Sequence, residues 1–206
     1  MNNVIFDFDG TIADSYHFIS RYLVKNINNW GVEKNITNID EAYLKTLSIK
    51  EILQYLKIPK RKVPLIIFQV RQEIKKNMDQ ILPISNILIT LKTLKENRIK
   101  LFILSTNSKE NINLFLKFNK SEALFDHIYS DKSFFSKEKK LKKIMKKHNM
   151  IPGCTFYIGD ESRDVHAAKC SKIKSIAVTW GFESQENLIR CRPDHIINKP
   201  CELLEF

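Results

Sequence analysis

The sequence predicts an α/β protein built on a doubly wound parallel sheet, with a small all-helical block inserted after the first strand. Short apolar runs without a helical period alternate with longer stretches in which apolar residues recur every three or four positions. Strands that alternate with helices pair in parallel through right-handed crossovers. The exception is residues 14–84, where helical stretches follow one another and no strand pattern intervenes.

Each predicted strand ends at small or polar residues that favour a loop. The first apolar run, residues 4–8, stops at Asp9-Gly10-Thr11, and the second, residues 99–104, stops at Ser105-Thr106-Asn107. The further strands are predicted at residues 127–129, 155–158, 175–178 and 195–197. Helices are predicted between them at residues 85–97, 109–118, 137–148 and 162–168.

The inserted block reads as a second domain that lies above the sheet. Trp30-Gly31 and Ile58-Pro59 break its helical pattern. Its predicted helices are residues 16–29, 39–47, 49–56 and 63–81. The expected division is therefore a core of residues 1–13 and 85–206 and a helical domain of residues 14–84.

The composition excludes several classes of protein. With 43% hydrophobic and 28% charged residues, the 206-residue chain is not of low complexity or disordered. Its start lacks the pattern of a signal peptide, and no apolar run approaches the ~18 residues of a membrane span. The four cysteines form no Cys-x-x-Cys pair, so we expect small buried thiols in a reduced, cytoplasmic protein. The five histidines show no metal-ligand spacing such as His-x-x-x-His, and we expect ordinary surface or core histidines.

A formal charge of +11 raises the question of nucleic-acid binding. Residues 139–147 are rich in lysine, but Leu141, Ile144 and Met145 recur at helical spacing and predict one buried stripe with the lysines in solvent. The segment has no interleaved aromatic residues for base stacking. We therefore expect no specific nucleic-acid partner and no membrane.

Polar side chains follow three of the predicted strands, at the sheet edge where doubly wound folds bind ligands. Asp7 and Asp9 would share one face of an extended strand, and two carboxylates so close repel unless a cation or a proton intervenes. A hard divalent cation such as Mg²⁺ would neutralise this repulsion, and we expect a phosphate group as the second ligand of the site. The candidate residues are Asp7, Asp9, Thr106, Asn107, Asp160 and Asp164, with a lysine from residues 132–140.

These residues resemble the four motifs of the haloacid dehalogenase-like (HAD) superfamily of phosphohydrolases. In order, the motifs are residues 7–11 (DFDGT), Thr106 at the end of the second apolar run, a lysine, and residues 159–164 (GDESRD). For the second motif we favour Thr106 over Ser105. For the lysine we favour Lys137, which stands at a predicted helix start, over its neighbours Lys132, Lys139 and Lys140. Residues 178–182 (VTWGF) and a helical insertion after the first motif resemble the phosphoglycolate phosphatase-like branch, with a Rossmann-like core and a helical cap.

The resemblance implies a role for each residue. Asp7 would be the nucleophile that forms an aspartyl-phosphate, and Asp9 the general acid and then the general base. Asp7, Asp160 and the backbone carbonyl of Asp9 would bind Mg²⁺, supported by Asp164. The residues that would bind the phosphoryl group are Thr106, Asn107 and Lys137.

The expected function is thus that of a Mg²⁺-dependent phosphatase acting on a small phosphorylated metabolite, as a monomer or homodimer. A sugar-phosphate mutase and a pyrophosphatase share these motifs and stay open as alternatives. Mutase relatives carry a histidine roughly where this chain has Ile19, and His17 is displaced from that position. Alternatives of another class are a basic nucleic-acid-binding protein and a catalytically silent partner protein on the same fold.

Overall fold

A six-stranded, fully parallel sheet forms the centre of the protein in a computed structural model that describes residues 1–30, 43, 46–47, 49–131 and 137–206. The strand order is β3-β2-β1-β4-β5-β6. The strands are β1 (Asn3–Phe6), β2 (Lys100–Ser105), β3 (His127–Ser130), β4 (Thr155–Gly159), β5 (Lys174–Val178) and β6 (His195–Ile197). All six predicted strands are confirmed.

The central strand is buried on both faces, which is why its sequence reads as a continuous apolar run. Val4, Ile5 and Phe6 are fully buried. β1 nevertheless ends at Phe6, before the apolar run does. Asp7 and Asp9 therefore lie beyond the strand, and the prediction that they share one face of it is wrong.

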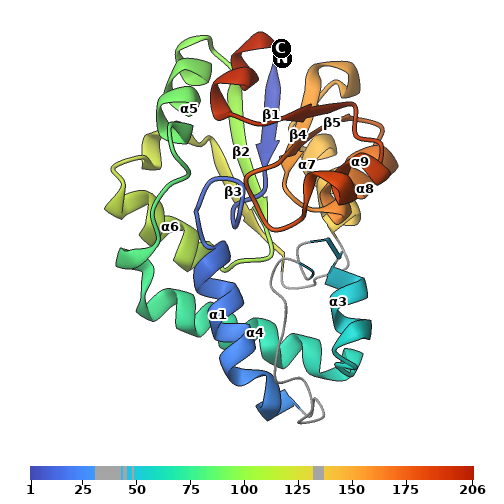
Figure 1. The fold of residues 1–206 in the computed structure, drawn as a ribbon. Helices are drawn as coiled ribbons and strands as arrows, with labels where there is room; N and C mark the ends of the chain where they lie inside the picture. The colour runs from blue at the N-terminus through green and yellow to red at the C-terminus, as the bar shows by residue number, and fades with distance from the viewer. Residues whose placement is uncertain (31–42, 44–45, 48, 132–136) are drawn as a thin grey trace.

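Helices cover both faces of the sheet, as Figure 1 shows. α5 (Ile87–Glu96) and α6 (Lys109–Phe118) pack on the face that contains Val4 and Phe6. α7 (Lys137–Lys147) and α8 (Ser162–Cys170) pack on the opposite face, which contains Ile5. The structure also contains α9 (Gln185–Arg190), which the sequence did not predict because six residues are too short to show a helical period.

The inserted segment contributes α1 (Tyr16–Asn26), α3 (Ile49–Tyr55) and α4 (Val63–Lys76), which lie beyond the carboxyl ends of the strands (Figure 1). The predicted helix at residues 39–47 falls mostly outside the described residues. The predicted helices 16–29 and 63–81 end in short 3₁₀ turns rather than continuing as α-helix. These and the remaining 3₁₀ turns are Ile27–Trp30, Lys60–Lys62, Met78–Gln80, Glu122–Leu124, Pro152–Cys154 and Pro200–Glu205.

The chain enters and leaves the inserted segment through two adjacent passages. The amide of Asp14 donates to the carbonyl of Leu82 at 2.8 Å, and the amide of Ile84 donates to the carbonyl of Ile12 at 2.9 Å. The predicted boundaries, after residue 13 and after residue 84, fall at these bonds. The division into two domains stays a prediction, since residues of the segment such as Ile74 belong to the same apolar cluster as the sheet.

The lysine-rich helix α7 has the predicted pattern of burial, and the cysteines do not. In α7, Leu141, Ile144 and Met145 are buried while most of the lysines are exposed, which confirms the predicted surface helix. The prediction of buried thiols is wrong: Cys201 is exposed, and Cys154, Cys170 and Cys191 are partly exposed. No helix in the described part of the chain is long and apolar enough to cross a membrane.

Candidate active site

The candidate site lies where the strand order reverses. β1 pairs with β2 on one side, where the chain continues to β3, and with β4 on the other side, where it continues to β5 and β6. Such a switch point opens a crevice beyond the carboxyl ends of the strands. Asp7 follows β1, Asp160 follows β4, and Thr106 follows β2. Parallel pairing of these three strands therefore brings their polar residues to one edge.

Three buried carboxylates form the centre of the site. One carboxylate oxygen from each of Asp7, Asp160 and Asp164 lies within 4.8 Å of the other two. Asp160 is held on both oxygens, because Thr11 Oγ1 donates to Oδ1 at 2.7 Å and the amide of Phe182 donates to Oδ2 at 2.8 Å. The structure thus brings together three of the predicted residues.

Lys137, the first residue of α7, joins this cluster. Its Nζ lies 2.8 Å from Asp7 Oδ2 and 2.5 Å from Asp164 Oδ1, and the side chain is buried. Burial would lower the pKa of Lys137, but the charges of Asp164 and Asp7 outweigh it and raise the pKa. Its rivals Lys139 and Lys140 are not buried, and Lys132 lies outside the described residues.

The charges at this point do not balance within the described residues. Burial, together with the nearby carboxylates, raises the pKa of Asp160 well above its usual value and that of Asp164 to about 6. The charged groups are four carboxylates and two cations: Asp7, Asp160, Glu161 and Asp164 against Lys137 and Arg163. With all four carboxylates ionised, these six groups carry a net charge of −2. A hard divalent cation bound to the carboxylate oxygens would balance that charge and oppose the rise in their pKa values, so the residues present suit Mg²⁺.

Asp9 occupies a different environment from Asp7. Its Oδ1 accepts a bond from Ser15 Oγ at 3.0 Å, and its Oδ2 accepts one from Asn107 Nδ2 at 3.0 Å. Burial raises the pKa of Asp9 to about 7, and the charge of Asp7 adds to the shift. Asp7 therefore lies beside the cations Lys137 and Arg163, whereas Asp9 is held by neutral hydrogen-bond donors.

The end of β2 separates the two candidates for the second motif. Ser105 is buried and its Oγ accepts a bond from the amide of Asn107 at 3.0 Å, whereas Thr106 lines a cavity. Asn107 donates to Asp9 and accepts from Asn111 Nδ2 at 3.0 Å. In this structure the Asn107 side chain therefore positions Asp9 and, like Thr106, lines the cavity; its role in binding phosphate stays a prediction.

The sequence did not assign roles to several residues of the site. Ser15 and Thr11 were visible only as parts of a motif, and their bonds to Asp9 and Asp160 depend on tertiary structure. Arg163 pairs with Glu161 and lies 3.9 Å from Asp7 Oδ2. Its place within residues 159–164 was the one signal that could have identified it.

Glu183, also not singled out, connects the loop after β5 to the start of α8. It accepts bonds from the amide and the hydroxyl of Ser162, both at 2.9 Å. Burial raises the pKa of Glu183 to about 8, with the charge of Glu161 contributing. Near neutral pH it therefore adds little negative charge to the cluster.

A cavity of about 220 Å³ extends from this site into the inserted helices. Its polar end includes Asp9, Arg71, Thr106, Asn107 and Arg163. Most of the remaining wall is apolar and comes from α1, α3, α4 and their connections: Ile19, Leu23, Val24, Ile27, Ile52, Leu56, Ile58, Val63, Ile66, Ile67, Val70 and Ile74.

Arg71 reaches from α4 to the loops after β2 and β3. One guanidinium nitrogen donates to the carbonyls of Thr106 and Asp131, the latter at 3.1 Å. Among the described residues, the buried Nε of Arg71 has no hydrogen-bond partner. Burial lowers the pKa of Arg71, against the charges of Asp9 and Asp131. Arg71 is thus the cation at the boundary between the polar end and the apolar wall.

Known proteins resemble this chain over its whole length. A phosphoglycolate phosphatase of Synechococcus elongatus is 28% identical over 205 residues, which cover 100% of this chain and 96% of the relative. Pyrophosphatase PpaX of Bacillus mycoides is 22% identical over 217 residues, covering 99% and 95%. The crystal structure of a predicted phosphatase from Clostridium acetobutylicum superposes with a TM-score of 0.81 at 25% identity, covering 100% and 99%.

The family model described as haloacid dehalogenase-like hydrolase matches residues 4–178, which include the strand ends, the acidic cluster and Lys137. With this match and the fold that accompanies it, the chain belongs to the haloacid dehalogenase-like hydrolase family.

Proposed function

We propose that this protein is a Mg²⁺-dependent phosphatase that hydrolyses a small phosphorylated metabolite through an aspartyl-phosphate intermediate. The observation that carries the proposal is the contrast between Asp7, which contacts Lys137 inside the acidic cluster, and Asp9, which neutral donors hold apart from it. A nucleophile must be ionised and a general acid must hold a proton, so the two need different environments. The names of the relatives, phosphatase and pyrophosphatase, agree with this reaction class.

The first step is attack of an Asp7 oxygen on phosphorus. The amide of Phe8 donates to Asp7 Oδ1 at 2.8 Å and Lys137 pairs with Oδ2, so the carboxylate is fixed in position. As the bond from Asp7 to phosphorus forms, the bond from phosphorus to the ester oxygen breaks, and Asp9 gives its proton to that oxygen. Lys137 and the hydroxyl of Thr106 bind the transferring phosphoryl oxygens.

The second step is hydrolysis of the aspartyl-phosphate. Asp9, now ionised, accepts a proton from water as the water oxygen attacks phosphorus, and Asp7 leaves as a carboxylate. The chemistry that Mg²⁺ supplies, when held by Asp7, Asp160 and the carbonyl of Asp9, is neutralisation of charge between the nucleophile and the phosphoryl group. Asp164 supports this site through its contact with Lys137.

The cavity wall points to the substrate class. An apolar wall disfavours a second highly charged group deep in the cavity, because burying an unpaired charge is costly. Arg71, at the boundary of the polar end, suits one acceptor group close to the phosphate. We propose a phosphate monoester with a largely apolar leaving group. Phosphoglycolate and pyrophosphate, the substrates in the relatives' names, are the competing candidates.

The mutase alternative has less support from the inserted segment. Ile19, near the position where mutase relatives carry a histidine, is buried and lines the cavity. His17 is exposed. A phosphotransfer within one sugar needs a group in the cap that handles the proton of the accepting hydroxyl, and Ile19 offers none.

The test is the substitution Asp7→Asn, assayed with an aryl phosphate and excess Mg²⁺. An amide is a far poorer nucleophile than a carboxylate, so we expect turnover to fall by more than about 10³-fold with the melting transition retained. The matched control is Asp14→Asn, because Asp14 is an exposed aspartate just after the same motif. Activity within a few fold of wild type in a folded Asp7→Asn protein would contradict the proposal.

A further inference from the structure

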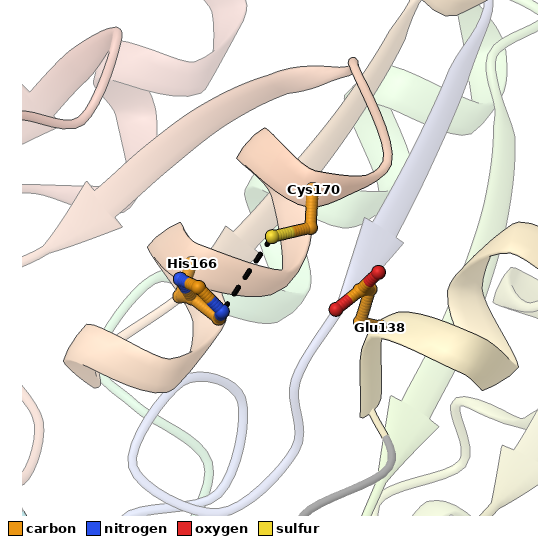
Figure 2. Close-up of side chains that lie close together, drawn as sticks. All are labelled: Glu138, His166 and Cys170. Atoms are coloured by element: carbon orange, nitrogen blue, oxygen red, sulfur yellow. Dashed lines mark hydrogen bonds between the residues drawn. The ribbon is translucent and has the colours of Figure 1, made fainter.

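Three side chains of different chemistry meet on the outer surface of α7 and α8. Figure 2 shows Glu138 from the first turn of α7 facing His166 and Cys170 of α8. A carboxylate oxygen, a ring nitrogen and the sulfur lie within 4.8 Å of one another. His166 is exposed and the other two are partly exposed, so solvent ions can reach this group. We call these three residues the α7–α8 triad.

Helix geometry brings two members of the triad together. His166 and Cys170 are four residues apart on α8, so their side chains lie on one face of the helix. The distance from His166 Nε2 to Cys170 Sγ is 3.5 Å, drawn as the dashed line in Figure 2. Tetrahedral zinc with Zn–S near 2.3 Å and Zn–N near 2.05 Å requires an S···N separation of about 3.6 Å. These two atoms are therefore already spaced as ligands of one ion.

The third member comes from a neighbouring helix. α7 packs against α8, and an oxygen of Glu138 lies within 4.8 Å of the sulfur and of the ring nitrogen. A tetrahedral site requires about 3.6 Å from the oxygen to the sulfur and about 3.4 Å from the oxygen to the ring nitrogen, so a side-chain movement of roughly 1 Å completes three ligands. A water molecule would take the fourth position, as the site is open to solvent.

We propose that Glu138, His166 and Cys170 form a binding site for Zn²⁺ or a cation of similar softness. A thiolate, an imidazole and one carboxylate are ligands that suit zinc, whereas Mg²⁺ prefers oxygen donors only. The triad thus differs in ligand chemistry from the acidic cluster, where all donors are carboxylates. The inference goes beyond the proposed phosphatase activity and does not depend on it.

One contact competes with the ion. Lys142 Nζ lies 2.5 Å from Glu138 Oε1, an ion pair between residues four apart on α7. Both side chains are open to solvent, where such ion pairs are weak, so a bound dication can displace this one. Removal of the lysine charge should consequently strengthen the site.

The triad lies on the same two helices as residues of the candidate active site. Glu138 directly follows Lys137, and His166 comes two residues after Asp164. An ion bound by the triad would hold the first turn of α7 to the C-terminal half of α8. Zinc binding should therefore raise the thermal stability of the full-length protein, since a ligand that binds only the folded state stabilises it.

The test is a Co²⁺ titration of the metal-free full-length protein in excess Mg²⁺, followed by displacement with Zn²⁺. We expect the thiolate-to-cobalt charge-transfer absorption to saturate at one equivalent and to disappear when Zn²⁺ is added. The variants Cys170→Ser and His166→Ala should lose the absorption or bind at least about tenfold more weakly, because even outer-sphere partners of a metal account for that factor. The matched control is Cys154→Ser, which changes another partly exposed thiol and should leave the titration unchanged.

The remaining outcomes are equally informative. Glu138→Gln should bind Zn²⁺ at least about tenfold more weakly than wild type, while Lys142→Ala, which removes the competing cation, should bind it at least as tightly. Wild-type affinity in Glu138→Gln would remove Glu138 from the site and overturn the three-residue proposal. Absence of the charge-transfer absorption in the wild-type protein, or its full retention in Cys170→Ser, would overturn it as well. Melting curves without metal establish that each variant is folded.

Discussion

At the scale of single residues, the candidate site depends on how sharply the chain turns after β1. Asp7 and Asp9 are two positions apart, yet one contacts Lys137 and the other contacts Ser15 and Asn107. The turn continues at Gly10, whose φ of +74° lies in the left-handed region that side chains disfavour. The separation of the two carboxylates into different environments is thus a local backbone property.

We expect Gly10→Ala to destabilise the protein and reduce its activity. A Cβ at this position would collide with the Asp160 carboxylate and with the ring of Phe182, in addition to the strain of a positive φ. Together these effects should lower the free energy of unfolding by more than about 2 kcal/mol, measured by urea denaturation. Turnover of an aryl phosphate should fall in the folded fraction, since Asp160 must move.

Gly153→Ala is the matched control for this experiment. No heavy atom outside its chain neighbours lies within 4 Å of a Cβ built at Gly153. Its unfolding free energy should change by less than about 0.5 kcal/mol. Equal stability of the two variants would show that the close packing around Asp160 is not needed.

The residues that converge on the site were more predictable than their contacts. Asp7, Asp160 and Thr106 could be placed at one edge because each follows a strand of a parallel sheet. The bond from Ser15 to Asp9 could not be predicted, because its formation depends on how α1 leaves the turn. The His166–Cys170 spacing was visible in the sequence, but the approach of Glu138 depends on helix packing.

At the scale of elements, both edge strands of the sheet are attached to their neighbours by the same arrangement of hydrogen bonds. The two edge strands, β3 and β6, each begin with His-Ile directly after an aspartate, Asp126 and Asp194. Asp126 Oδ2 accepts a bond from the amide of Leu101 at 2.8 Å, and Asp194 Oδ2 accepts one from that of Ser175 at 2.9 Å. Each aspartate also pairs with a lysine. These carboxylates attach the start of each edge strand to its neighbour.

The attachment should weaken in acid. Partial burial alone would raise the pKa of Asp194, but its bonds from Ser175 and Lys174 outweigh this and lower the pKa to about 2. A depressed pKa means that the stabilisation is complete above the unfolded value of about 3.8 and is lost as the pH falls toward about 2. For Asp126, the bonds from Lys95 and Leu101 likewise outweigh burial and lower the pKa.

We therefore expect Asp194→Asn to cost about 1 kcal/mol of unfolding free energy at neutral pH, a value reduced from the linkage limit because the side chain is partly exposed. The difference in unfolding free energy between this variant and wild type should shrink between about pH 4 and pH 2, as measured by urea denaturation at each pH. Asp79→Asn is the control, since Asp79 is exposed, and should be neutral. A difference that does not depend on pH would contradict this explanation.

The elements differ in how well the sequence predicted them, for physical reasons. The central strands are buried on both faces and leave continuous apolar runs. The edge strands β3 and β6 are partly exposed and leave shorter runs, yet all six strands were predicted. α9 has only about one and a half turns, and its N-terminus is capped by the Ser184 side chain, which accepts a bond from the amide of Asn187. So short a helix depends on its cap and its packing of Leu188 rather than on a periodic pattern.

At the scale of the whole molecule, the excess positive charge does not by itself indicate a partner. The lysines of α7 lie mostly in solvent while one face of the helix packs on the sheet, so they form a solvated helix surface. Lys137, buried among carboxylates, is the exception within that helix. The charge is consistent with attraction of anionic phosphate esters, and the described residues contain no aromatic stacking platform along α7.

The cavity between the inserted helices and the strand ends depends on the whole fold, and its apolar wall leads to the last prediction. For a series of alkyl phosphates of increasing length, kcat/KM should rise about fourfold for each methylene that enters the cavity, which corresponds to about 0.8 kcal/mol per buried methylene. The series should be compared, with and without Mg²⁺, with phosphoglycolate, pyrophosphate, nucleoside monophosphates and hexose phosphates. Arg21→Met, on the exposed side of α1, should leave the ranking unchanged, whereas Arg71→Met should raise KM across the series. A clear preference for phosphoglycolate or pyrophosphate would contradict the proposal of an apolar leaving group. It would not contradict the proposed phosphatase reaction, which the Asp7→Asn variant tests separately.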